Sequence, residues 1–118
     1  MKLAKILSAF VLTLAVAMMV ACAPANSEKA VAKMKKAGFD ATSIVYSEVQ
    51  EDGAVASVAA QKGGLLSTNG LTATLYKTSK QAKAAYNETK NAEGKSNCTL
   101  VGKWVVWGSE EAVKAFKK

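Results

Sequence analysis

The sequence predicts an α+β fold, a two-layer sandwich in which an antiparallel sheet of about five strands packs against three helices. Two observations support this prediction. Three segments carry apolar residues at helical spacing, and five short runs with strand character lie between them, several joined by glycine-containing turns. The expected order is α-β-β-β-α-β-β-α.

The three predicted helices share one pattern. Each starts at a serine, with alanine three residues later and a bulky apolar residue seven later. This spacing puts the apolar groups on one face, and a serine hydroxyl can accept a free N–H of the first turn. The first and third segments agree further, SEKAVAKMKK against SEEAVKAFKK, which fits either convergent design or an internal duplication. The sets are Ser27/Ala30/Met34, Ser79/Ala82/Tyr86 and Ser109/Ala112/Phe116.

The helix ends carry their own signals. Gly38 predicts that the first helix ends in a left-handed turn, with Phe39 folding back on Met34. Thr78 and Gln81 stand at the spacing of a capping box, which predicts the start of the second helix.

Turn residues divide the strand runs. Residues 42–50 and 54–61 flank Asp52-Gly53, which predicts a hairpin with a type I′ turn. A single strand is expected from Leu71 to Lys77. Residues 97–101 and 104–108 flank Gly102-Lys103, which suits a type II′ turn. Residues 62–70 are expected to form the longest loop.

The first 22 residues have the pattern of an export signal. Lys2 and Lys5 precede an apolar run that ends just before Cys22. The run is about 15 residues, shorter than the roughly 20 that span a bilayer but long enough for a secretory signal. The four residues that close this segment, Met19-Val20-Ala21-Cys22, resemble the lipobox of bacterial lipoprotein precursors.

This resemblance implies that the Cys22 thiol receives a diacylglycerol and that cleavage before it makes it the new N-terminus. The chain would then comprise a signal peptide (1–21), a lipidated cysteine with a short tether (22–26) and a single α+β domain (27–118). Its acyl chains would hold it in the lipid bilayer, on the extracytoplasmic face of the cell membrane. Two alternatives remain open: ordinary cleavage at the A-x-A patterns around Cys22, which would release a soluble protein, and an uncleaved anchor helix.

The charge of the chain narrows the class of partner. Residues 22–118 carry 14 lysines and 9 acidic residues, and the chain contains no arginine. Because nucleic-acid readers and phosphate clamps favour the bidentate guanidinium group, we expect no nucleic-acid partner. The positive charge is expected to give solubility and attraction to anionic lipid or wall polymer.

Catalytic residues are scarce. The chain has no histidine, the commonest general base and a frequent metal ligand. Glu48, Glu51 and Asp52 are expected to form a solvated turn rather than a calcium site, although an enzyme would need a pair such as Glu48 and Asp52 in a cleft. Cys98 is expected to be a small buried hydrophobe, with a reactive thiol as the alternative. We therefore expect neither an enzyme nor a cofactor or metal.

A binding surface is easier to place. In the hairpin of residues 97–108, Trp104 shares a face with Thr99, while Trp107 lies on the more apolar face. We therefore expect Trp107 in the core beneath the helices and Trp104 on an open sheet face. Thr72, Thr74 and Tyr76 are also expected to turn outward. The predicted binding residues on this face, for a sugar or a peptide, are Tyr76, Trp104, Thr74 and Thr99; the alternative is that the aromatics only shield the sheet.

Two further features stay ambiguous in the sequence. Leu65 and Leu66 either begin an extra strand or form an exposed apolar contact for another cell-envelope protein. In the first hairpin either the set Val45, Val49 and Val58 or the set Ile44, Tyr46 and Val55 faces the core.

The end of the chain carries a second resemblance. The run GKWVVWGSEEAV from Gly102 to Val113 is similar to the ending of small uncharacterised lipoproteins from Gram-positive bacteria. The similarity implies a terminal hairpin followed by a short amphipathic helix, and it implies no activity.

Overall fold

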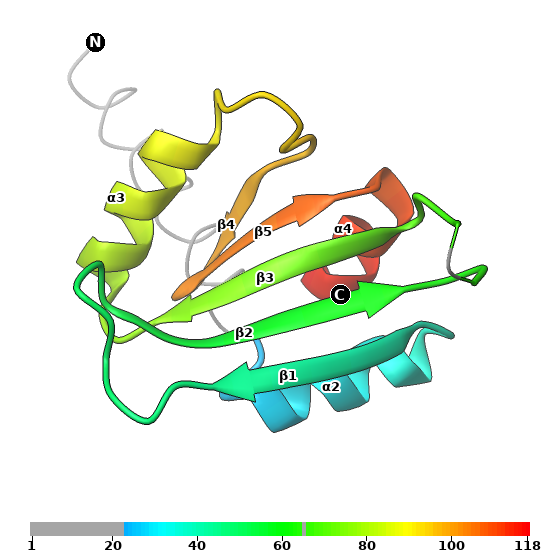
Figure 1. Cartoon of the computed structure of the whole chain (residues 1–118), viewed down its shortest axis with the longest axis horizontal. Coiled ribbons are helices and arrows are strands. Elements are labelled where there is room, and N and C mark those ends of the chain that lie inside the picture. Colours follow the sequence, from blue (N-terminus) through cyan, green and yellow to red (C-terminus); the bar gives the residue numbers. More distant parts are fainter. Residues whose placement is uncertain (1–22, 65) are drawn as a thin grey trace, which may run out of the picture.

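The computed structural model describes residues 23–64 and 66–118, and this part of the chain has the predicted α+β fold. Three helices and a five-stranded antiparallel sheet follow one another in the expected order (Figure 1). The elements are α2 (Ser27–Lys36), β1 (Asp40–Val45), β2 (Ala54–Gln61), β3 (Gly70–Tyr76), α3 (Ser79–Thr89), β4 (Thr99–Val101), β5 (Trp104–Gly108) and α4 (Glu110–Lys117).

The sheet has the strand order β1-β2-β3-β5-β4. Chain neighbours β1, β2 and β3 pair antiparallel, and β5 then pairs with β3, which leaves the short β4 at the far edge. Because successive side chains alternate between the two faces, this register divides the strand residues into two sets. The two sets meet different helices.

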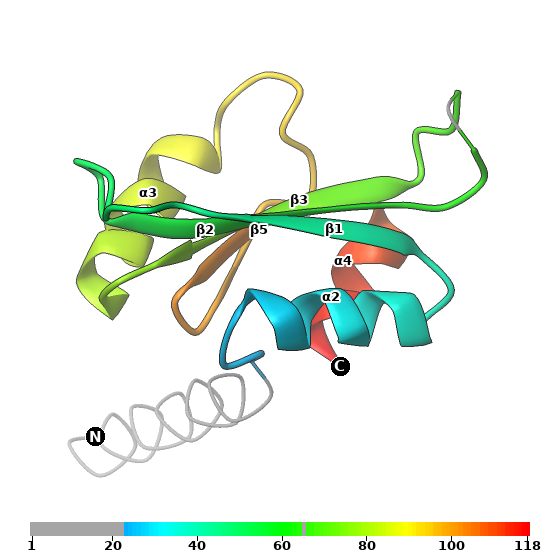
Figure 2. The ribbon, with the colours of Figure 1, turned by 60° about the horizontal axis from the view of Figure 1, so that its bottom comes forward.

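Helices α2 and α4 cover one face of the sheet (Figure 2). The largest side chains between them and the sheet are Met34, Trp104 and Phe116, all fully buried. The Trp104 and Phe116 rings meet edge to face, with centroids 5.3 Å apart. Neither set expected for the first hairpin faces this core as a whole. Val58 is fully buried here, but Val45 and Val49 of the same set are exposed; of the other set, Ile44 is exposed and Tyr46 is half-buried near α3.

Helix α3 packs against part of the opposite face. Ala82 of this helix contacts Tyr76 of β3 and Val105 of β5, and Leu100 and Cys98 pack around them. Burial raises the pKa of the Cys98 thiol, which keeps it protonated and disfavours the reactive alternative. None of the described helices covers the other end of this face (Figure 2).

The expected placement of the two tryptophans was wrong. The pairing of Val101 with Trp104 is as predicted, but α2 and α4 cover the Trp104 face, and Trp107 is half-buried on the other face. The more apolar face of this hairpin does need cover, and α3 supplies it. Trp104 can be fully buried because its indole Nε1–H donates to the carbonyl oxygen of Pro24 at 2.9 Å.

Several local predictions are confirmed and others need correction. The α2 end is as predicted, with Gly38 at φ +96° and the Phe39 N–H bonded to the Met34 carbonyl oxygen at 3.0 Å. The cap of α2 is Asn26 rather than Ser27, whereas Ser109 caps α4. Thr78 caps α3, but the capping box is incomplete, because the Gln81 side-chain oxygen accepts a hydrogen bond from the Thr78 hydroxyl and not from its backbone N–H.

The first hairpin is longer than predicted. Strand β1 ends at Val45 and β2 begins at Ala54, so residues 46–53 connect them, and at the tip the Gly53 N–H bonds to the Gln50 carbonyl oxygen. Gly53 has φ +92°, and the Asp52 carboxylate accepts the Ala54 N–H, so these two residues do form the turn but not a two-residue type I′ turn. The longest connection is residues 90–98 rather than 62–70.

Candidate ligand-binding groove

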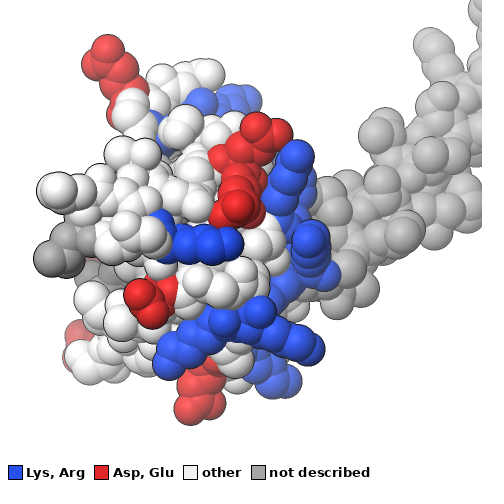
Figure 3. All heavy atoms as spheres, turned by 90° about the vertical axis from the view of Figure 1, so that its right-hand side faces the viewer, with Lys and Arg blue, Asp and Glu red and all other residues white. Residues whose placement is uncertain are grey.

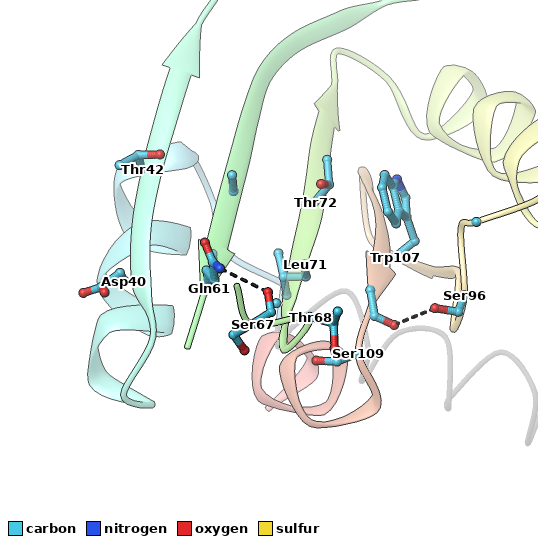
Figure 4. Close-up of a pocket in the computed structure, with 15 residues that line it drawn as sticks. Asp40, Thr42, Gln61, Ser67, Thr68, Leu71, Thr72, Ser96, Trp107 and Ser109 are labelled. Atoms are coloured by element: carbon cyan, nitrogen blue, oxygen red, sulfur yellow. Dashed lines mark hydrogen bonds between the residues drawn. The ribbon is translucent and has the colours of Figure 1, made fainter. Parts of the chain in front are cut away.

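An open groove of about 800 Å³ lies on the sheet face opposite α2 and α4, at the end that α3 leaves uncovered (Figure 4). Its floor is a row of paired residues that crosses four strands, namely Thr42, Ala59, Thr72 and Trp107. Ala59 is the smallest of these side chains and keeps the middle of the floor low. Residues 67–68 and the segment around Ser96 border the groove.

Trp107 is the large aromatic residue of the groove. It stands beside Thr72 on the neighbouring strand, and the Lys95 ammonium lies 5.8 Å from the centroid of its ring. The ring is half-buried, so part of it remains accessible to solvent. An accessible indole can bury a large apolar area against a flat ligand.

Two glycines let the backbones approach closely at one end of the groove. A Cβ at Gly70 would collide with the carbonyl oxygen of Ala60, and a Cβ at Gly108 would collide with the carbonyl oxygen of Gly70. The Ser109 N–H bonds to this Gly70 oxygen at 2.8 Å. Glycine is therefore required at both positions by the contact between strands.

Side-chain hydrogen bonds hold the segments that border the groove. Gln61 donates from Nε2 to the carbonyl oxygen of Ser67 at 3.1 Å. Ser96 donates to the carbonyl oxygen of Gly108 at 3.2 Å (Figure 4), and Asn97 donates to the same oxygen at 2.9 Å. These bonds fix the 62–69 and 90–98 segments to the ends of β2 and β5.

A cluster of polar side chains behind the groove joins α4 to the 62–69 segment. Ser109 donates to the Asn69 side-chain oxygen at 2.6 Å, and Asn69 donates to the Glu111 carboxylate at 2.8 Å. Lys62 lies 3.6 Å from the same carboxylate. The Asn69 hydrogen bond and the Lys62 charge lower the pKa of Glu111.

The lining of the groove is polar but almost without charge. Among the described residues of the lining, Asp40 is the one ionisable side chain and no second group could act with it in acid–base catalysis; Lys95 stands at the border, beside Trp107. Gln61 and the half-buried Trp107 complete a surface of hydroxyl groups. The hydroxyl-bearing residues are Thr42, Thr72, Ser67, Thr68, Ser96 and Ser109.

The binding residues expected from the sequence do not form one site. Thr74 and Tyr76 share the face of the groove but line a second hollow of about 660 Å³, beside Glu51 and Asp52 of the first hairpin turn. Tyr76 is largely buried beneath α3. Burial, with the Asp52, Tyr46 and Glu88 charges in addition, raises its pKa.

The other expected residues lie elsewhere. Trp104 is fully buried on the opposite face, and Thr99 shares that face, so neither can bind a ligand in the groove. Leu66 begins no strand and is 99% exposed. The export signal with Cys22, and Leu65, lie outside the described residues.

Sequence reasoning missed Trp107 as the aromatic residue of the open face. A signal was present, because Ala82 and Tyr86 of the second predicted helix also need an apolar surface to cover. A single helix, α3, covers the apolar residues of the hairpin face that carries Trp107, and it does not bury Trp107 itself.

Comparison of the chain with protein-family models, with curated proteins and with solved structures finds no match. In the described part of the chain, no three His, Cys, Asp or Glu side chains are grouped so that they could hold a metal ion. None of the helices of that part is both long and apolar enough to cross a membrane.

Proposed function

We propose that this chain is a lipoprotein, anchored at Cys22 on the extracytoplasmic face of the cell membrane, whose domain binds a neutral polar ligand in the Trp107 groove. The anchor rests on the leader and its lipobox. The binding role rests on one observation, an open groove that combines an accessible indole with many hydroxyl groups and a single ionisable side chain. The domain is a binding module rather than an enzyme.

The chemistry of the lining selects the ligand class. An indole can stack on the apolar face of a sugar ring, while hydroxyl and amide side chains donate to and accept from its hydroxyl groups. Ligand sites of this size combine a few oriented polar groups with aromatic surface. Glycan fragments of the cell wall therefore fit the groove better than charged metabolites, and an uncharged peptide is the second ligand of this class.

Fluorescence titration tests the groove, because the two tryptophans lie on opposite faces. Soluble wall glycan fragments should change the emission of Trp107 and leave that of the buried Trp104 unchanged. The Trp107→Phe variant should lose the response, and the matched Thr74→Ala variant, altered in the second hollow, should keep it. A response that survives in Trp107→Phe would place the ligand elsewhere.

Mass spectrometry of the N-terminal peptide tests the anchor. We expect protein from host membranes to begin at Cys22 and to carry a diacylglycerol, and the Cys22→Ala variant to accumulate as uncleaved precursor. An unmodified N-terminus at Pro24 or Asn26, directly after an A-x-A pattern, would show ordinary secretion instead. An intact Met1 would show an uncleaved anchor.

The exposed Leu66 favours a second candidate function. An apolar side chain that is 99% exposed, on a loop fixed at both ends, suits contact with another protein of the cell envelope. In that case the chain is an accessory protein, and Leu66 rather than Trp107 contacts its partner.

A further inference from the structure

The segment that leads into α2 is fastened to the domain. Ala23 packs against the core beneath α2 and α4 and lies beside Gly102 in the β4–β5 turn. The Pro24 carbonyl oxygen accepts the Trp104 Nε1–H at 2.9 Å, and the Asn26 side chain accepts the Lys29 N–H at 2.9 Å. The chain therefore leaves the domain at a fixed point on the side that carries α2 and α4.

The same side carries much of the positive charge. Residues 27–36 and 110–118 contain seven lysines and three glutamates, a formal charge of +4. Six of these lysines are exposed and Lys33 is half-buried. In Figure 3 lysine side chains gather on the right and at the bottom, the side of α2 and α4. We call this surface the lysine face: Lys29, Lys33, Lys35, Lys36, Lys114, Lys117 and Lys118.

The acidic residues on these helices reduce this charge only in part. Glu110 lies 3.1 Å from Lys114, and Glu111 is bonded to Asn69 at the edge next to the groove. Strand residues around the groove, on the other side of the sheet, supply one ionisable group, Asp40. The groove end of that side is thus nearly neutral, whereas α3 at its other end carries Lys80, Lys83 and Lys90 with Glu88.

We infer that the lysine face lies on the anionic headgroups of the membrane that anchors the chain, so that the Trp107 groove faces away from the bilayer. This inference rests on the proposed lipid anchor, because Cys22 is the direct chain neighbour of Ala23. A short, fastened tether keeps the lysines near the bilayer, where charge attraction acts within about 8 Å. Each lysine near an anionic surface adds to the attraction, and an acyl anchor with a basic patch is a stable combination.

Amine labelling of the lipidated protein in vesicles tests the orientation. The protein is reconstituted in phosphatidylcholine with or without phosphatidylglycerol, and acetylation of each lysine is followed by mass spectrometry. In anionic vesicles we expect several-fold slower acetylation of Lys29, Lys36 and Lys117, reversed by high salt. Lys80 and Lys83 on α3 should react equally in both vesicles.

Charge-matched variants separate the lysine face from charge in general. The triple variant Lys29→Gln, Lys36→Gln, Lys117→Gln should lose the protection of Lys35 and Lys114 in anionic vesicles. The control triple variant Lys80→Gln, Lys83→Gln, Lys90→Gln should keep it. All six positions are exposed, so neither set should affect folding.

Other outcomes overturn the inference. Equal acetylation in both vesicles, or protection of α3 instead, would show that this face does not meet the bilayer. Protection by a soluble anionic wall polymer but not by phosphatidylglycerol would assign the face to the wall. If the protein is lost from neutral vesicles, the lipid anchor has failed, and this result says nothing against the lysine face. The lysine face is then tested by the binding of the unanchored chain to anionic vesicles, which high salt should weaken.

Discussion

At the scale of single residues, the two tryptophans have opposite roles although they lie three positions apart. Trp104 fills the core between the sheet and α4 and bonds to Pro24, so it joins the N-terminal segment to the domain. Trp107 stands on the other face, where Thr72 and Lys95 surround part of its ring. An odd spacing along a strand always separates two side chains in this way.

Replacement of each tryptophan by phenylalanine should distinguish these roles. Trp104→Phe leaves a cavity and an unpaired carbonyl oxygen at Pro24, and we expect a loss of roughly 2 to 4 kcal/mol in the free energy of unfolding. Trp107→Phe removes no hydrogen bond between described residues and should cost less than about 1 kcal/mol. Urea unfolding followed by circular dichroism measures both values. Equal losses would contradict the assignment of Trp104 to the core.

At the scale of elements, the sequence predicts the order of helices and strands because each has local signals. Gly38 ends α2 and Ser109 begins α4, as their positions indicate. Strand β3 differs from the prediction by one residue at each end. These signals depend on residues that are close in the sequence, so the elements can be predicted without the contacts between distant segments.

The assignment of sheet faces could not be predicted with the same certainty. The pairing of Val101 with Trp104 is local, but the helix that covers each face comes from far along the chain. Both faces of the β4–β5 hairpin are apolar, since α2 and α4 cover one and α3 covers part of the other. The groove site depends on where α3 stops, and for that reason its aromatic residue was assigned to the wrong face.

At the scale of the whole molecule, one sheet separates two surfaces of different character. The side covered by α2 and α4 carries the lysine face and the fastened N-terminal segment, and the side covered in part by α3 carries the groove. Both core clusters share the strands of this sheet, with Val105 and Val106 pointing to opposite sides. A small domain built on a shared sheet is expected to unfold as one unit.

Alkaline titration should reveal this cooperation. Burial raises the pKa of Tyr76 above the usual value for a tyrosine, about 10, so the native state favours the neutral phenol. The stability that this preference contributes is fully present below pH 10 and is lost as the pH rises through the raised pKa. We expect the urea midpoint, followed by emission of Trp104 in the other cluster, to fall above pH 10. The midpoint of Tyr76→Phe should fall less. Ionisation of the other tyrosines and of the lysines lowers the midpoint of both proteins alike. Equal falls in both proteins would show that Tyr76 ionisation is not linked to unfolding of the whole domain.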